Sequence, residues 1–139
     1  MHEPTLATRP TRFGRLAPTL AVGAIDRAVD FYVGVLGFRK AFENGSPVGF
    51  VILRRDEAEL HLTLDRGHTP VARNIAHLLV DDAAGLCAHL EARKVRIVKG
   101  LRDADFGLRC FVFADPDGNR IDVGQILAPD SAADMGEAP

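Results

Sequence analysis

The chain has 139 residues, 47% of them hydrophobic and 26% charged, and its formal net charge is −2. These values are typical of a globular protein, so we expect one compact domain with a hydrophobic core. The near-neutral charge gives no electrostatic reason to bind nucleic acid or an anionic membrane. No apolar run has the length of a membrane span and the N-terminus lacks the pattern of a secretory signal, which favours a cytoplasmic protein.

The two cysteines, Cys87 and Cys110, do not have the spacing of a metal site. Each lies among apolar residues. We therefore expect both to be buried free thiols, as is usual in a reducing cytoplasm.

The first half of the chain predicts one strand, one helix and three further strands. Residues 1–14 are rich in Thr, Pro and Arg without periodicity and are predicted to form a tail or an arm. Apolar residues recur at helical spacing in the helix, and Gly37 follows it as a C-terminal cap. The expected elements are a strand at 16–22, the helix at 24–36, and strands at 38–43, 48–53 and 58–64.

A linker at 65–72 separates the second half, which repeats this order. Asp82 is expected to be the N-cap of the second helix. The residues Asp115-Pro116-Asp117-Gly118-Asn119 favour a tight turn between two strands, which should set strand register without contacting a ligand. The expected elements are a strand at 74–80, a helix at 82–93, a strand at 95–98, a polar loop at 99–107, strands at 111–113 and 120–123, and a disordered tail at 127–139.

The repeated order predicts an α+β protein built from two βαβββ modules, at 16–65 and 74–126, within one domain at 15–126. Neither module can bury its sheet face alone, so the two should pack together. Alternation along the strands also assigns faces. Leu60 and Leu62 share one face of their strand and His61 lies on the other, while Asp122 lies opposite Ile121 and Val123.

Three stretches resemble the vicinal oxygen chelate superfamily of glyoxalase I, extradiol dioxygenases and bleomycin resistance proteins. They are Asp30-Phe31-Tyr32 through Leu36-Gly37-Phe38, Glu59-Leu60-His61-Leu62, and the turn at 115–119. Phe-Gly-Leu-Arg-Cys-Phe at 106–111 and Val-Gly-Gln at 123–125 are most similar to the bleomycin resistance branch. The resemblance implies a curled mixed sheet that encloses a cleft, and a homodimer in which the N-terminal strand can be exchanged.

The resemblance also implies a function. Bleomycin resistance proteins bind a flat, cationic drug in a groove and sequester it without chemistry and without a cofactor. For this chain we expect a small organic ligand, with no nucleic acid or membrane partner. The candidate ligand-binding residues are Glu59, His61, His77, Phe106, Arg109 and Asp122.

The alternative implied by the resemblance is a metal-dependent glyoxalase, another lyase or isomerase, or a dioxygenase. The positions that match the family's metal ligands are Ala17, His61, Ile75 and Asp122, and two of these have no ligating atom. A shifted site for a divalent metal ion could use His61, His77 and Asp122, which have the composition of a site with two histidines and one carboxylate.

Overall fold

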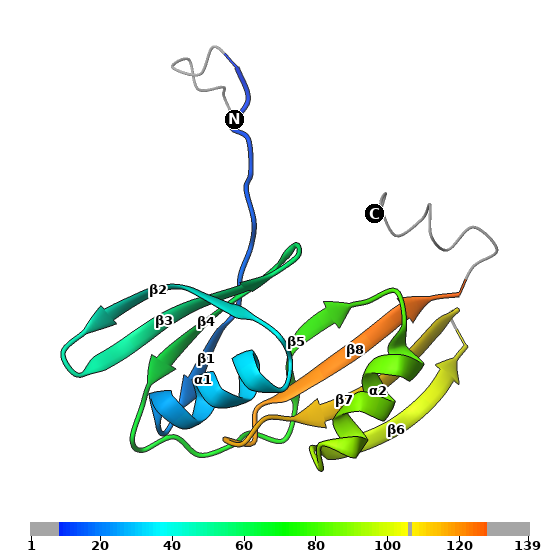
Figure 1. The fold of residues 1–139 in the computed structure, drawn as a ribbon. Helices are drawn as coiled ribbons and strands as arrows, with labels where there is room; N and C mark the ends of the chain where they lie inside the picture. The colour runs from blue at the N-terminus through cyan, green and yellow to red at the C-terminus, as the bar shows by residue number, and fades with distance from the viewer. Residues whose placement is uncertain (1–8, 106, 128–139) are drawn as a thin grey trace.

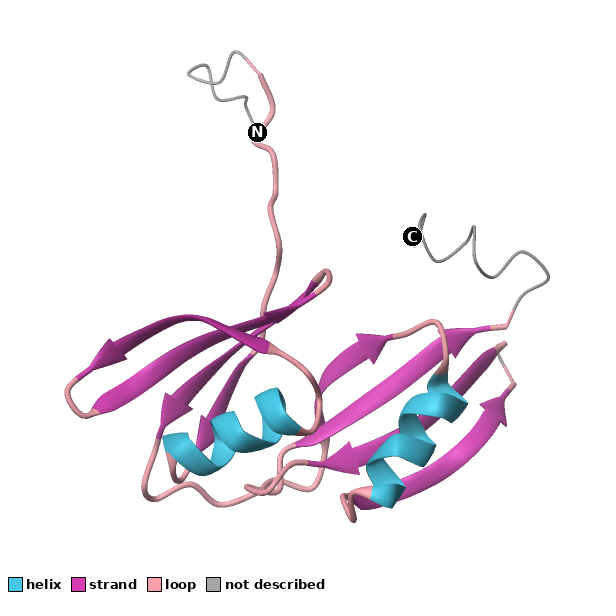
Figure 2. Ribbon diagram, viewed as in Figure 1, coloured by secondary structure: helices cyan, strands magenta, loops and turns pink. Residues whose placement is uncertain are grey.

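The structure, a computed structural model, describes residues 9–105 and 107–127. It contains two βαβββ modules side by side, each with a four-stranded sheet and one helix (Figures 1 and 2). The predicted α+β class and the two modules are confirmed. The expected single curled sheet is not observed, because the strands form two separate sheets that do not close around a cleft.

The two modules have the same strand order. The first contains β1 (Thr19–Val22), α1 (Ile25–Gly34), β2 (Arg39–Gly45), β3 (Val48–Arg55) and β4 (Ala58–Leu64), in the sheet order β1-β4-β3-β2. The second contains β5 (Asn74–Leu79), α2 (Ala83–Ala92), β6 (Arg96–Ala104), β7 (Leu108–Ala114) and β8 (Arg120–Ile126), in the order β5-β8-β7-β6. β1 is parallel to its neighbour β4, and β5 is parallel to its neighbour β8. The other neighbouring strands are antiparallel.

Both predicted helix caps are confirmed. Gly37 has a positive φ of 74° and follows α1, where the Phe38 amide donates to the Tyr32 carbonyl at 2.9 Å. The Asp82 side chain accepts a hydrogen bond from the Gly85 amide at 2.9 Å at the start of α2.

Several predicted boundaries are wrong. β7 begins at Leu108 rather than at residue 111, and β8 continues to Ile126 rather than ending at residue 123. β1 begins at Thr19 rather than at residue 16. β6 continues to Ala104, so most of the stretch expected to be a polar loop is a strand paired with β7. Register shifts on either side of Lys99 break the simple alternation of β6, which explains why periodicity did not reveal it. The second cysteine also differs from expectation, since Cys87 is buried but Cys110 is only partly so.

One hydrophobic core joins the two modules. Leu60 and Leu62 of β4 and Phe111 and Phe113 of β7 face the helices and are buried. The Phe31 ring of α1 lies 6.3 Å from the Phe113 ring, centroid to centroid, so the first helix contacts the second module directly. With one face of each sheet covered in this way, the opposite face of each sheet remains open.

The turn between β7 and β8 has a fixed internal geometry. Asp115 Oδ1 accepts hydrogen bonds from the amides of Asp117 and Asn119 at 2.8 and 2.9 Å. Gly118 adopts a positive φ of 80°, which a residue with a side chain rarely does. Asp115, Asp117 and Asn119 are all buried, which is unusual for polar turn residues.

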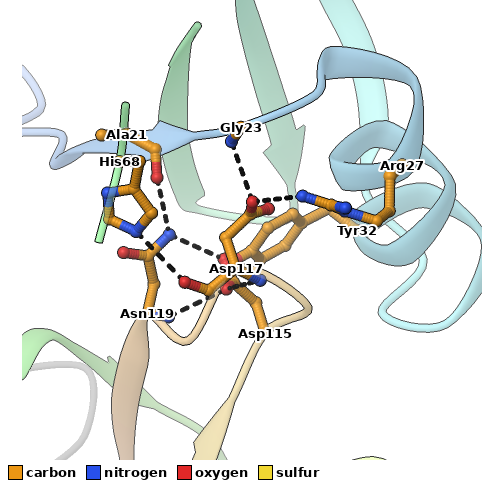
Figure 3. A network of polar contacts seen from close by, with 8 residues as sticks. All are labelled: Ala21, Gly23, Arg27, Tyr32, His68, Asp115, Asp117 and Asn119. Carbon is orange, nitrogen blue, oxygen red and sulfur yellow. Dashed lines mark hydrogen bonds and ion pairs between the residues drawn. The ribbon is translucent and has the colours of Figure 1, made fainter. Parts of the chain in front are cut away.

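These three residues, here termed the inter-module clasp, also bind the first module (Figure 3). Asp115 Oδ2 accepts a hydrogen bond from the Tyr32 hydroxyl at 2.7 Å. Asp117 Oδ1 accepts from the Gly23 amide at 2.8 Å and from Arg27 Nη2 at 2.6 Å.

The third residue of the clasp, Asn119, donates from Nδ2 to the Ala21 carbonyl at 3.0 Å. Burial raises the pKa of Tyr32 well above its ordinary value, and the negative charge of Asp115 raises it further, so the hydroxyl keeps its proton. The turn therefore sets strand register, as expected, and in addition connects the two modules.

The clasp should make a large contribution to stability. Asp115→Asn replaces an acceptor with an amide whose NH₂ group would face the donors around it, and should lower the free energy of unfolding by about 2 kcal/mol or more. Urea unfolding provides the measurement. Asp103→Asn makes the same chemical change in an exposed ion pair with Arg109 and should leave the unfolding midpoint nearly unchanged. Equal effects of the two substitutions would contradict this role of the clasp.

Candidate functional site

The open face of the first sheet carries polar and aromatic side chains. Glu59 and His61 of β4 lie on it, as alternation predicted, and both are partly buried. The neighbouring strand β3 adds Arg54 opposite Glu59 and Ile52 opposite His61 in the antiparallel register. Directly paired residues have their side chains on the same face, so these four form one continuous surface.

An aromatic row crosses this face. The rings of Phe42 and Phe50 are 6.4 Å apart, and those of Phe50 and His61 are 5.4 Å apart, each pair edge to face. Phe42 is half exposed although it is a large apolar residue. Exposed aromatic rings on a sheet are suited to stacking against a flat molecule. Sequence reasoning did not single out these two phenylalanines, although the alternation of β3 could have placed Phe50 on the face of His61.

Glu59 is surrounded by donors. Its Oε1 accepts hydrogen bonds from Arg54 Nε at 3.0 Å and from Arg15 Nη1 at 3.3 Å, and its Oε2 lies 2.7 Å from His61 Nε2. The hydrogen bond with His61, followed by the one with Arg54, lowers the pKa of Glu59. The Glu59 carboxylate is thus ionised, and its charge is already compensated by Arg54, Arg15 and His61, which makes it a weak counter-charge for a cationic ligand.

The open face of the second sheet carries a second polar pair. His77 of β5 and Asp122 of β8 are directly opposite in the parallel register, and His77 Nδ1 lies 2.6 Å from Asp122 Oδ2. Both remain accessible, with 46% and 31% of their side-chain surfaces exposed. The imidazole lies over Gly124, where an added Cβ would come within 3.0 Å of His77 Cε1. This face therefore presents one imidazole held by one carboxylate.

Two candidate residues do not join these groups. Arg109 alternates with Cys110 along β7, so it lies on the face opposite Asp122, and its guanidinium binds Asp103 Oδ1 at 2.8 Å. Phe106 lies outside the described residues. Of the six candidates, the structure brings together Glu59 with His61 on one sheet, and His77 with Asp122 on the other.

The shifted metal set is not assembled. Across residues 9–105 and 107–127, no three His, Cys, Asp or Glu side chains are grouped closely enough to hold a metal ion. His61 and His77 belong to separate sheets, and each is hydrogen-bonded to a carboxylate of its own sheet. The residues present therefore do not fit a divalent metal site formed by His61, His77 and Asp122 in one chain.

Two cavities lie away from the candidate residues. One, of about 290 Å³, lies between α1 and the β2–β3 hairpin. The other, of about 410 Å³, lies between the C-terminal ends of the two helices and the turn before β8. None of the five candidates within the described residues lines either of these two cavities.

The protein is thus of the class built from two paired βαβββ modules, with the helices on one side and open sheet faces on the other. The sequence matches the Glyoxalase/Bleomycin resistance protein/Dioxygenase superfamily over residues 12–123, and the chain belongs to that superfamily. This confirms the resemblance inferred from the three sequence stretches. A comparison with curated proteins gives no match.

Several solved structures are similar to this chain. One, from Sphaerobacter thermophilus DSM 20745, is 27% identical with a TM-score of 0.70, over 81% of this chain and 97% of its own. The bleomycin-binding protein of bleomycin-producing Streptomyces verticillus, complexed with copper(II)-bleomycin, is 27% identical with a TM-score of 0.67, over 82% and 97%. A bleomycin resistance determinant encoded on the transposon Tn5 is 24% identical with a TM-score of 0.71, over 82% and 98%, and shares the fold.

Within the described part of the chain, neither helix has the length and apolar character required to cross a membrane.

The charge cluster around Glu59 predicts a dependence of stability on pH. Because folding lowers the pKa of Glu59, its ionised form stabilises the fold above the ordinary value of 4.5, and this effect is lost as the pH falls through the lowered value. Urea unfolding of wild type and Glu59→Gln should show a stability difference at neutral pH that shrinks below pH 4.5. A difference that stays constant with pH would contradict the assigned ion pairs.

Proposed function

We propose that this protein binds and sequesters a flat organic molecule of the bleomycin type without catalysis, as a cytoplasmic homodimer. The aromatic row of Phe42, Phe50 and His61 on the open face of the first sheet is the observation that carries this proposal. Such rings offer flat apolar surface for stacking, and Arg54 and Glu59 beside them offer hydrogen-bonding groups. The similarity to a bleomycin-binding protein of Streptomyces verticillus supports the same ligand class.

Binding without chemistry is supported by the state of the polar groups. Each histidine on the open faces is already hydrogen-bonded to a carboxylate, Glu59 for His61 and Asp122 for His77. These pairs favour a rigid, preformed surface, which reduces the entropy lost on binding. A cytoplasmic location is supported by the free thiols of Cys87 and Cys110.

A homodimer would supply the second wall of the ligand site. In one chain the two polar pairs lie on separate open sheets, so neither faces an opposing surface. A second copy placed against these faces would turn them into an enclosed groove. The N-terminal arm, residues 9–18, extends away from the body of the chain (Figure 1). Phe13 and Leu16 on this arm are 92% and 97% exposed, which supports their burial against a second copy, with or without exchange of β1.

Calorimetric titration with bleomycin tests the ligand. We expect binding at micromolar protein concentration or below, and Phe50→Ala should weaken it about tenfold through the loss of stacking. Arg109→Ala is the matched control, because Arg109 lies on the other side of its sheet from Asp122, and it should bind like the wild type. The absence of heat, or equal losses in the two variants, would contradict the proposed ligand site.

Sedimentation of the protein at several concentrations tests the dimer. We expect a dimer for the wild type and dissociation toward monomer for the double variant Phe13→Ser, Leu16→Ser, because the arm loses its exposed apolar side chains. Val71→Ser also removes an exposed apolar side chain, but outside the arm, and should leave the dimer intact. A wild-type monomer at all concentrations would contradict the proposal.

A further inference from the structure

The larger of the two cavities lies where the two modules meet. Its lining comes from the C-terminal part of α1, the segment that joins α2 to β6, and the turn between β7 and β8. His89 Nε2 of α2 lies 2.8 Å from the Val35 carbonyl oxygen at the end of α1, so the two helix ends are held together. The volume of about 410 Å³ falls within the range of small-molecule sites, which is about 300–1,000 Å³.

The cavity combines apolar and basic surface. Its apolar lining includes the buried Phe31 and Ala114 and the partly exposed Val35 and Val95. The exposed basic residues of the lining lie close together in the sequence, and they are Arg93, Lys94 and Arg96. Apolar surface beside charged groups of one sign fits a ligand with an apolar body and an ionised head of the opposite sign.

One carboxylate also lines the cavity, but its hydrogen bonds are already made. Asp115 is only 5% exposed, and its Oδ2 accepts hydrogen bonds from the Tyr32 hydroxyl at 2.7 Å and from Asn119 Nδ2 at 3.0 Å. Its Oδ1 accepts from two amides of its own turn. By contrast, the three basic residues of the lining make no ion pair with any described residue. The accessible charge of the cavity is therefore positive.

Basic residues after a helix often serve only to satisfy its last carbonyl groups. In α2 backbone amides already do this. The Arg93 amide donates to the His89 carbonyl at 3.2 Å, and the Lys94 amide donates to the Glu91 carbonyl at 3.0 Å. The side chains of Arg93 and Lys94 are therefore not required as hydrogen-bonding caps.

Lys94 occupies a position that favours glycine. Its φ of 62° lies in the left-handed region, directly after the end of α2, where glycine is the usual residue. A lysine here has a conformational cost that glycine would avoid. Such a cost is expected where the side chain itself has a function.

We propose that this cavity binds a small carboxylic acid with an aromatic body. The body packs against Phe31 and Val35, and the ionised carboxylate pairs with Arg93 and Lys94. A guanidinium group can bind a carboxylate through two parallel hydrogen bonds. The site does not depend on the proposed binding of bleomycin, because it uses none of the residues assigned to that ligand, and its positive charge disfavours a cationic drug.

Calorimetric titration with 2-naphthoate tests the proposal, and 2-naphthamide is the matched neutral probe with the same rings. We expect one 2-naphthoate per chain, bound at least about tenfold more tightly than 2-naphthamide. Arg93→Gln should weaken 2-naphthoate binding about tenfold, because a charged hydrogen-bonding partner is lost. Arg39→Gln removes an exposed arginine of β2 that does not line the cavity, and it should bind like the wild type.

Lys94→Gly separates binding from folding. Glycine relieves the left-handed conformation, so the variant should unfold at the same urea concentration as the wild type or a higher one. It should nevertheless bind 2-naphthoate about threefold more weakly, because one positive charge is lost. Phe50→Ala on the first sheet should leave 2-naphthoate binding unchanged, which distinguishes this site from the one proposed for bleomycin.

Three results would each overturn the proposal. The first is equal binding of 2-naphthoate and 2-naphthamide by the wild type. The second is the absence of 2-naphthoate binding at millimolar concentration. The third is wild-type affinity for 2-naphthoate in the folded Arg93→Gln and Lys94→Gly variants.

Discussion

The buried contacts of the inter-module clasp determine how the rest of the structure is arranged. Asp115 and Asp117 place two carboxylates where water is largely excluded, which is favourable only because amides, a guanidinium and the Tyr32 hydroxyl surround them. The clasp and the shared hydrophobic core hold the two modules side by side with both helices on one side. The two open sheet faces, and therefore every polar pair on them, follow from that arrangement.

The two open faces differ in chemistry although the modules share one topology. The first has aromatic rings beside a carboxylate that is compensated by two arginines and a histidine. The second has an exposed imidazole–carboxylate pair formed by His77 and Asp122. An aromatic surface and a surface with one imidazole–carboxylate pair thus occupy equivalent places in a repeated fold. The fold positions such groups without dictating what they do.

Local signals in the sequence predicted much of this structure. The alternation at 58–64 correctly predicts the faces of Glu59 and His61. The positions of Gly37 and Asp82 correctly predict two helix caps. Strand faces and helix caps both depend on only a few neighbouring residues. The face of Arg109 could also have been predicted, since it lies two residues from the buried Phe111 and shares its side of β7.

Other features depend on contacts between distant segments. The bulges that extend β6 result from pairing with β7 and leave no periodic pattern. The role of the turn residues in joining the modules requires Tyr32, more than eighty positions earlier, to lie against Asp115. The pairing of His77 with Asp122 depends on the register of two parallel strands joined by a long crossover. None of these contacts can be read from spacing alone.

The central claim is that the open sheet faces, rather than the helix side, form the surface that binds a bleomycin-type drug. Chemical-shift mapping of the isotope-labelled protein during titration with bleomycin tests this claim most directly. The account predicts that shifts concentrate at Phe50, His61 and His77 and are absent at His89 on the helix side. Shifts confined to α1, α2 and the cavities beneath them, or no shifts at saturating ligand, would contradict it.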